Sequence, residues 1–372
     1  MSATETSISL PAGLLPKDGR FGSGPSKVRQ DAISALLDLA PNYLGTSHRQ
    51  NTVKDHVSRL RNGLSSLFHL PAEWEIILGN GGTTLFWDAA SFGLIESSSQ
   101  HLAFGEFSSK FATVVQKAPH LEEPEIVSSE PGTCPSAVSS NVDTYALTHN
   151  ETSTGVTAPL SRPNNDGLVL VDATSAAGAI SWDPKEVDCY YFAPQKALAS
   201  DGGLWLAACS PAAIERIERL SSGDRWAPAG LDLGIALSNS RQEQTYNTPS
   251  LATIFLAAET VDWINNSGGL SWAEQRCSQS SGIIYQWATD RSFAQPFVVN
   301  ADQRSPVVCT VDFEGVDADT VSAVLRANGV IDTESYRKLG RNQLRLATFP
   351  SIAPEDVEAL CACIDYIVDA LG

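Results

Sequence analysis

Residues 168–208 carry the strongest indication of the fold, and they read LVLVDATSAAGAISWDPKEVDCYYFAPQKALASDGGLWLAA. Three short apolar runs stand in this stretch, at 168–172, 188–193 and 203–208. Continuous apolar runs of this length predict strands that are buried on both faces of a sheet. Upstream, WEIILG (74–79) is a further expected strand, and TTLFWDAASFGLI (83–95) after it reads as a helix. Apolar strands that alternate with helices indicate an α/β fold with a mostly parallel sheet covered by helices.

The pattern changes at about residue 266. The C-terminal part reads as strand, helix, strand, helix at 307–313, 317–329, 342–348 and 355–371. We therefore expect a large α/β domain over 22–265 and a smaller α+β domain over 266–372, with the N-terminal segment 1–21 packed near the small domain. A helix over 250–264 is expected to link the two, and their cleft is the expected site.

A helix is also expected directly after Pro25. The run SKVRQDAISALLDLA (26–40) has its apolar side chains at helical spacing, and these are Val28, Ile33, Leu36 and Leu37. Such spacing predicts that one face of the helix is apolar.

Composition and charge exclude several classes of protein. The chain has 372 residues, of which 42% are hydrophobic, and a net charge of −18 from 25 basic and 43 acidic residues. This apolar content is typical of a globular protein rather than a disordered one. The acidity argues against binding to nucleic acid or to an anionic membrane surface, because both need cationic contacts. Any anionic substrate must therefore be held by a few well-placed cations.

The cysteines and the N-terminus indicate the compartment. Seven scattered cysteines without a CxxC pair favour free thiols over a disulfide framework or a zinc site, and we expect no bound metal. The N-terminus shows no basic patch followed by an apolar core, and no run of about 18 apolar residues occurs that could span a membrane. We expect a cytoplasmic protein.

Lys196 and Asp172 are the first candidate catalytic residues. Lys196 follows the aromatic run YYFA in an apolar setting, where loss of hydration lowers the pKa of a lysine and makes it a nucleophile. Asp172 ends the run LVLVD, and ligands bind at strand ends in open α/β sheets. A lone lysine more often extends its charged end to solvent, and Asp172 could instead cap the following turn. Together the two residues favour pyridoxal phosphate chemistry, in which a lysine forms an imine and a carboxylate pairs with the ring nitrogen.

The glycine turn at 81–82 is a candidate phosphate site. Gly81 and Gly82 follow an expected strand, and Thr83 and Thr84 open an expected helix, so that unpaired N–H groups and hydroxyls converge. The turn is neither GxGxxG nor GxxxxGK[ST], so no dinucleotide or nucleoside triphosphate motif is present.

Nine motifs in order give the chain a resemblance to a known family. It resembles the phosphoserine aminotransferases, class V enzymes of fold type I that use pyridoxal phosphate, in their actinobacterial form. The motifs are FGSGPSKVR (21–29), TSHRQ (46–50), GNGGTTLFWDAASFG (79–93), FGEFSSKFA (104–112), HNETSTG (149–155), VDATSAAGA (171–179), YYFAPQKALASDGGLW (190–205), YNTPS (246–250) and YRKLGRNQLRLATFP (336–350).

This resemblance implies a role for each residue of a cofactor site. Lys196 would form the imine and Asp172 would pair with the pyridine nitrogen, while Thr152 would bond the phenolic oxygen. An aromatic ring stacks on the pyridine in the family, often that of Trp, and Phe107 stands there in this chain. The residues implied in phosphate binding are Thr83, Thr84 and Gln195 from one subunit and Asn247 and Thr248 from its neighbour. The expected assembly is therefore a homodimer with shared active sites.

The resemblance also implies a substrate site and a reaction. His48, Arg49 and Arg337 would receive the distal anion, and Arg345 the α-carboxylate. Many members have His-Arg where this chain has Tyr336-Arg337, and Lys338 or Arg341 are candidate replacements for that donor. The implied reaction converts 3-phosphohydroxypyruvate and L-glutamate into O-phospho-L-serine and 2-oxoglutarate in serine biosynthesis. A phosphorylated threonine analogue of pyridoxine biosynthesis is a second candidate substrate.

Three alternatives remain open from the sequence. An alanine–glyoxylate or serine–pyruvate aminotransferase needs no second anion site, so the SHR motif and Arg337 count against it. A cysteine desulfurase needs a nucleophilic cysteine on a mobile loop, and no cysteine here stands out as one. A member that uses the fold only for binding is disfavoured by the presence of Lys196, Asp172 and Thr152 together.

Overall fold

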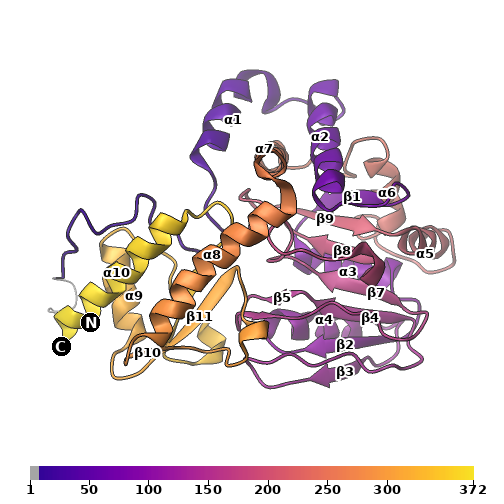
Figure 1. Ribbon diagram of the computed structural model, residues 1–372. Helices are drawn as coiled ribbons and strands as arrows, with labels where there is room; N and C mark the ends of the chain where they lie inside the picture. The colour runs from indigo at the N-terminus through magenta and orange to yellow at the C-terminus, as the bar shows by residue number, and fades with distance from the viewer. Residues whose placement is uncertain (1–7) are drawn as a thin grey trace.

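A seven-stranded sheet forms the centre of the computed structural model, which describes residues 8–372 (Figure 1). Its strand order is β1-β9-β8-β7-β4-β2-β3, and all strands run parallel except β9, which is antiparallel to both of its neighbours. The bounds are β1 (Glu75–Asn80), β2 (Ser99–Ala103), β3 (Glu125–Ser128), β4 (Thr144–Thr148), β7 (Leu168–Asp172), β8 (Cys189–Phe192) and β9 (Leu204–Cys209). The predicted α/β fold with a mostly parallel sheet is confirmed.

Helices cover both faces of this sheet because its strands are apolar on both sides. Successive strand residues alternate between two cores: Val169 and Val171 pack in one, and Leu168 and Leu170 in the other. The first core includes side chains of α2 (Asn51–Leu67) and α7 (Leu251–Ser267). The second core includes side chains of α3 (Thr83–Gly93), α4 (Glu106–Lys117), α5 (Pro211–Ser221) and α6 (Leu233–Ser240).

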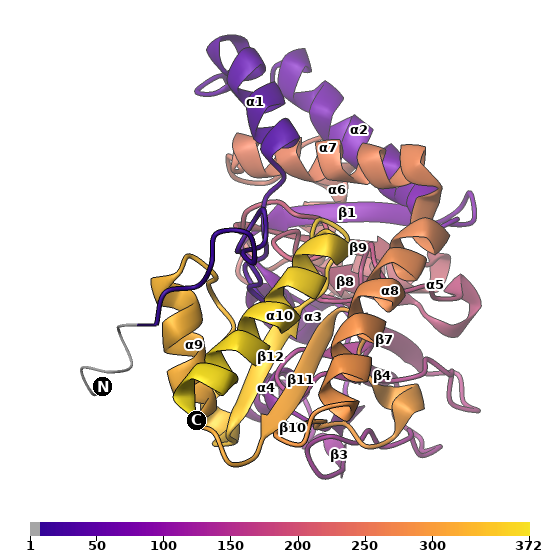
Figure 2. The ribbon, with the colours of Figure 1, turned by 60° about the vertical axis from the view of Figure 1, so that its left-hand side comes forward.

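The C-terminal part is built around a second, antiparallel sheet. Its strand order is β10-β11-β12, and α8 and α10 lie side by side next to it (Figure 2). The bounds are α8 (Gly269–Thr289), β10 (Ala294–Pro296), β11 (Val308–Phe313), α9 (Ala318–Ala327), β12 (Gln343–Ala347) and α10 (Pro354–Leu371). A two-stranded sheet of β5 (Asn150–Glu151) and β6 (Val156–Thr157) lies between β4 and β7 in sequence. The domain bounds at 22, 265 and 266 stay predictions.

The N-terminal segment runs beside the C-terminal part. The amide of Leu10 donates to the Asn328 side chain at 2.9 Å, and the amide of Lys17 donates to the Asp356 side chain at 2.8 Å. The backbone of Arg20 pairs with that of Ile331 in an isolated parallel β-bridge. Residues 1–7 of the segment that we expected near the small domain lie outside the described residues.

Helix α1 (Gln30–Tyr43) begins four residues later than the expected run at 26. Two of its predicted apolar positions remain exposed in the single chain, Ile33 at 38% and Leu37 at 73%. In Figure 1, α1 and α2 stand with α7 at the top of the molecule, at one end of the large sheet. Over residues 8–372, no helix is both long enough and apolar enough to cross a membrane.

Candidate active site

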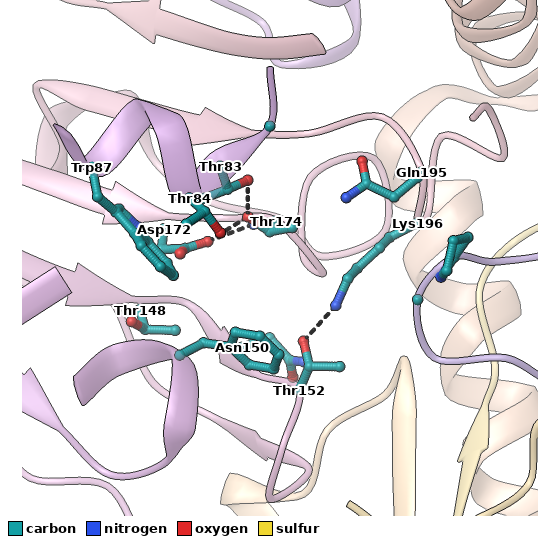
Figure 3. Close-up of a pocket in the computed structure, with 14 residues that line it drawn as sticks. Thr83, Thr84, Trp87, Thr148, Asn150, Thr152, Asp172, Thr174, Gln195 and Lys196 are labelled. Carbon is teal, nitrogen blue, oxygen red and sulfur yellow. Dashed lines mark hydrogen bonds between the residues drawn. The ribbon is translucent and has the colours of Figure 1, made fainter. Parts of the chain in front are cut away.

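A cavity of about 260 Å³ opens at the carboxyl ends of the parallel strands (Figure 3). This is where ligands bind in open α/β sheets, because loops and helix N-termini converge there. Seven of the residues proposed from the sequence line it, and these are Thr83, Thr84, Phe107, Thr152, Asp172, Gln195 and Lys196. The tertiary structure therefore brings together side chains that are up to 113 positions apart in the chain.

Lys196 points into the cavity from the loop after β8. Its Nζ donates to Thr152 Oγ1 at 2.9 Å, and Thr152 in turn donates to Ser175 Oγ at 2.9 Å. The lysine is 7% exposed, and burial, together with the positive charge of Arg345, lowers its pKa to about 8. About a tenth of the amine is therefore uncharged at pH 7, and about half at pH 8, and this form can act as a nucleophile or a base.

Asp172 occupies the other side of the cavity, at the last position of β7 (Figure 3). Its Oδ1 accepts hydrogen bonds from the Thr174 amide at 2.9 Å and the Thr174 hydroxyl at 2.6 Å. No hydrogen bond from residues 8–372 reaches its Oδ2. Burial raises the pKa of Asp172, so a cationic partner is needed to hold the carboxylate ionised. One oxygen therefore caps a turn, and the other is available to a ligand.

The N-terminus of α3 forms the third wall. Gly81 adopts φ of +110°, which favours glycine, and its amide donates to Gly203 O at 2.9 Å. Thr83 then begins the helix, so the first N–H groups of the helix lack intrahelical partners and can bind an anion. Gln195 Oε1 is buried near the same cavity without a partner in the described chain.

Arg345 on β12 approaches the cavity from the C-terminal part. Its guanidinium Nη1 donates to Thr152 O at 3.3 Å, and its Nε is buried without a partner among residues 8–372. The Tyr336 ring lies between two site residues, with its centroid 5.3 Å from Arg345 Cζ and 5.9 Å from the Phe107 ring. An arginine held in this way presents its planar fork to a carboxylate.

The remaining cations near Arg345 differ in their availability. Arg337 is exposed and lines an open groove together with Arg345. Lys338 pairs with Glu106 at 2.5 Å, and Arg341 pairs with Asp312 at 2.5 Å. Both candidate replacements for the missing family histidine are thus already bound to carboxylates.

His48, Arg49, Asn247 and Thr248 lie together but do not line the cavity of their own chain. His48 Nδ1 is 3.3 Å from Thr248 Oγ1, although the two residues are 200 positions apart. The His48 Nε2 atom is buried without a partner in the described part of the chain, and Arg49, Asn247 and Thr248 are exposed. Burial, together with Arg49, lowers the pKa of His48.

Sequence reasoning missed several residues that line the cavity. Trp87, Thr148, Asn150 and Thr174 all face it, and Gly24 approaches Lys196 closely. Most of these lie within the quoted motifs, but the motifs do not say which of their residues turn toward a common point. Thr174 could have been found from the sequence, because it lies two residues after the strand-end Asp172 and a hydroxyl at that position can donate to the Asp172 carboxylate.

The residues present fit pyridoxal phosphate. A buried lysine of lowered pKa, a carboxylate with an uncommitted oxygen, an aromatic ring and an unpaired helix N-terminus face one cavity. These groups match the carbonyl, ring nitrogen, ring face and phosphate of that cofactor. Within residues 8–372 no group of three or more His, Cys, Asp or Glu side chains could hold a metal ion.

Comparison with known proteins decides the family. The family described as Aminotransferase class-V matches residues 21–334. The chain belongs to the class-V aminotransferases. It is 54% identical over 370 residues to the phosphoserine aminotransferase of a Nocardioides species, with 98% of this chain and 99% of that protein covered.

Two solved structures show how widely the class-V fold is shared. The phosphoserine aminotransferase of Cytophaga hutchinsonii superposes with a TM-score of 0.86 at 21% identity, covering 95% of this chain and 100% of that one. An alanine–glyoxylate aminotransferase from Nostoc gives a TM-score of 0.78 at 20% identity, covering 97% and 98%. The fold alone therefore does not identify the substrate, because both enzymes have it.

Proposed function

We propose that this class-V aminotransferase is a phosphoserine aminotransferase. It would convert 3-phosphohydroxypyruvate and L-glutamate into O-phospho-L-serine and 2-oxoglutarate, with pyridoxal phosphate in the cavity at Lys196. The observation that carries this proposal is the convergence of Lys196, Asp172 and the α3 N-terminus on one cavity beside Arg345. The 54% identity to a phosphoserine aminotransferase over nearly the whole of both chains supports the choice of substrate.

Each wall of the cavity has a part in the proposed mechanism. Bound pyridoxal phosphate supplies a carbonyl that takes up the amino group and a ring that withdraws electrons. Lys196, uncharged above a pKa of about 8, removes the proton from the substrate Cα and returns one. The Thr152 hydroxyl orients Nζ of Lys196. Asp172 would keep the ring nitrogen of the bound cofactor protonated, and Thr83, Thr84 and Gln195 would hold its phosphate.

Arg345 would bind the α-carboxylate of every substrate. Its fork lies next to Thr152, so a carboxylate held there directs the Cα–H bond toward Lys196. Glutamate and phosphoserine both carry a second anion, for which Arg337, His48 and Arg49 are the proposed partners. One set of cations can therefore serve both half-reactions in turn.

The active site would be completed across a homodimer. His48 and Thr248 contact each other away from the cavity of their own chain, so both would reach the cavity of the neighbouring subunit together. The apolar side chains of Ile33 and Leu37 on α1 are exposed in the single chain, and the partner subunit would cover them. Mixing an inactive Lys196→Ala chain with an inactive Asn247→Ala/Thr248→Ala chain should restore some activity. Hybrid dimers without activity would refute shared sites.

A substrate screen tests the proposed function. Phosphoserine and glutamate should react, whereas alanine and unphosphorylated serine should be slower by about two to three decades, because they leave the distal cations unpaired. Arg49→Ala should weaken phosphoserine and glutamate together and spare alanine, and Arg345→Ala should weaken all three. Efficient use of alanine with glyoxylate or pyruvate would replace the proposal with the alanine–glyoxylate alternative. The same screen includes the phosphorylated threonine analogue of pyridoxine biosynthesis.

The cysteine desulfurase alternative receives no support from the cavity. None of the seven cysteines lines it, and all except Cys134 are buried. Burial raises the pKa of the Cys277 and Cys309 thiols, which disfavours the nucleophilic thiolate.

A further inference from the structure

Glu151 is a buried carboxylate to which the mechanism above gives no part. It is 0% exposed and stands between Asn150 and Thr152, both of which line the cavity. No lysine or arginine of residues 8–372 forms an ion pair with it. A carboxylate buried without a cation is costly unless hydrogen-bond donors surround it.

Four hydrogen bonds satisfy the Glu151 carboxylate. One oxygen accepts from the Ser108 amide at 2.8 Å, and the other from the Ser153 amide at 3.1 Å, the Ser153 hydroxyl at 2.7 Å and the Phe107 amide at 3.4 Å. The amides of Phe107 and Ser108 belong to the first turn of α4, where intrahelical partners are lacking. The positive end of the helix also stabilises the negative charge. Glu151 therefore binds the N-terminus of α4 from 43 or 44 positions away.

Gly105 provides the space for this contact. A Cβ atom at position 105 would lie 2.3 Å from Glu151 Cγ and 2.4 Å from Cδ, far inside van der Waals contact. The φ of Gly105 is −179°, which any residue can adopt, so clearance and not backbone conformation requires glycine here. Gly105 in the motif FGEF is therefore required by the contact that Glu151 in the motif HNET makes with α4.

Phe107 is the residue that this contact holds in place. Its own amide donates to Glu151, and its ring lines the cavity with the centroid 5.4 Å from Lys196 Nζ. A ring that stacks on a flat ligand must be held at a set height and tilt, since the attraction falls off steeply with separation. The first turn of α4 sets that height, and the Glu151 carboxylate fixes the first turn.

We propose that Glu151 is a positioning residue that acts through α4 to set the Phe107 ring against the cofactor. The inference rests on the proposed cofactor site. Glu151→Gln keeps the size of the side chain but replaces one acceptor oxygen with a donor, which faces the donors of Ser108 or Ser153. The first turn of α4 should then shift, and the Phe107 ring with it.

A double-mutant cycle on pyridoxal phosphate binding tests the proposal. Glu151→Gln should raise the dissociation constant about three- to tenfold, the size expected for losing a good aromatic contact. In a Phe107→Ala background the same substitution should have almost no further effect, because the ring through which Glu151 acts is gone. Additive effects of the two substitutions would overturn the proposal, since they would show that Glu151 acts independently of Phe107.

Two controls separate positioning from folding and from the proposed function. Asp232 also caps a helix with its carboxylate, accepting from the amides of Gly234 and Ile235, and it does not line the cavity. Asp232→Asn should leave cofactor binding unchanged. In cofactor-free Glu151→Gln, the amides of Phe107 and Ser108 should exchange hydrogen faster than in the unmodified chain.

A second variant tests the proposal if Glu151→Gln does not fold. Gly105→Ala displaces the same carboxylate, so its effect on cofactor binding should also be non-additive with that of Phe107→Ala. Additive effects would overturn the proposal. Failure of the unmodified chain to bind pyridoxal phosphate would instead refute the proposed function.

Discussion

The absence of a side chain at Gly24 should be required for the correct placement of Lys196. It adopts φ of +151°, and a Cβ atom at this position would lie 2.8 Å from Lys196 Cε and 3.2 Å from Nζ. An ordinary carbon–carbon contact is about 3.5 Å, so Gly24→Ala requires a displacement of about 0.7 Å. Lys196 is buried, and its amine is held by Thr152, so the displacement moves the reactive nitrogen itself.

The expected loss follows from that displacement. A misplacement of about 1 Å at a reacting group can lower the rate about 100-fold, so we expect Gly24→Ala to lower kcat about 10- to 100-fold. The folded state should also lose about 1–3 kcal/mol from the added methyl group. KM should change less, because Arg345 is not displaced.

The assay compares two glycine substitutions. Steady-state kinetics, and the rate at which added pyridoxal phosphate attaches to Lys196, would be measured for Gly24→Ala and Gly13→Ala. A Cβ atom added at Gly13 would have nothing within 4 Å, so this position serves as the matched control. If the two variants reacted at the same rate, the steric reasoning about Lys196 would be refuted.

Lys196, Thr174 and Tyr336 each allow a further test. Because burial lowers the pKa of Lys196 from 10.5 to about 8, the folded protein binds fewer protons than the unfolded chain between these values, and its stability rises with pH there. In urea unfolding of the cofactor-free protein, the free energy of unfolding should therefore rise by about 3 kcal/mol relative to that of Lys196→Met between pH 8 and pH 10.5. A difference between the two proteins that stays constant over this range would contradict the lowered pKa. Thr174→Val removes a donor to Asp172, so the pKa of that carboxyl should rise and the acid limb of cofactor affinity should move to higher pH, while Thr174→Ser keeps the wild-type profile in a spectroscopic titration. Tyr336→Ala removes the ring beside Arg345 and should raise KM for glutamate and phosphoserine about three- to tenfold, whereas an equal rise for Tyr336→Phe would show that the ring is not the group responsible.

The strands and the two central catalytic candidates could be predicted from the sequence because both depend on local patterns. A buried strand needs a short apolar run, and LVLVD with Asp172 at its end contains the strand and the site residue in five positions. The direction of a strand is not a local property, since an apolar run reads the same either way. The reversed β9 therefore appeared only in the structure.

Helix α1 shows the same limit for burial. Its apolar spacing predicted an apolar face, and the face exists, but Leu37 is 73% exposed in the single chain. Periodicity reports which side of a helix is apolar and does not report what covers it. What covers such a face is settled by packing against other surfaces, which periodicity does not encode.

The tertiary structure decided how the site is held together. Glu151 accepts a hydrogen bond from the first turn of α4, and the missing side chain of Gly24 leaves room for that of Lys196. The side chain of His48 contacts that of Thr248, which lies 200 positions away in the sequence. None of these contacts has a spacing that a sequence pattern could reveal, because each forms only when distant segments fold against one another. The sequence by itself determined which chemical groups the protein has; the fold decided which of them face the same cavity, because only packing brings distant parts of the chain within hydrogen-bond distance.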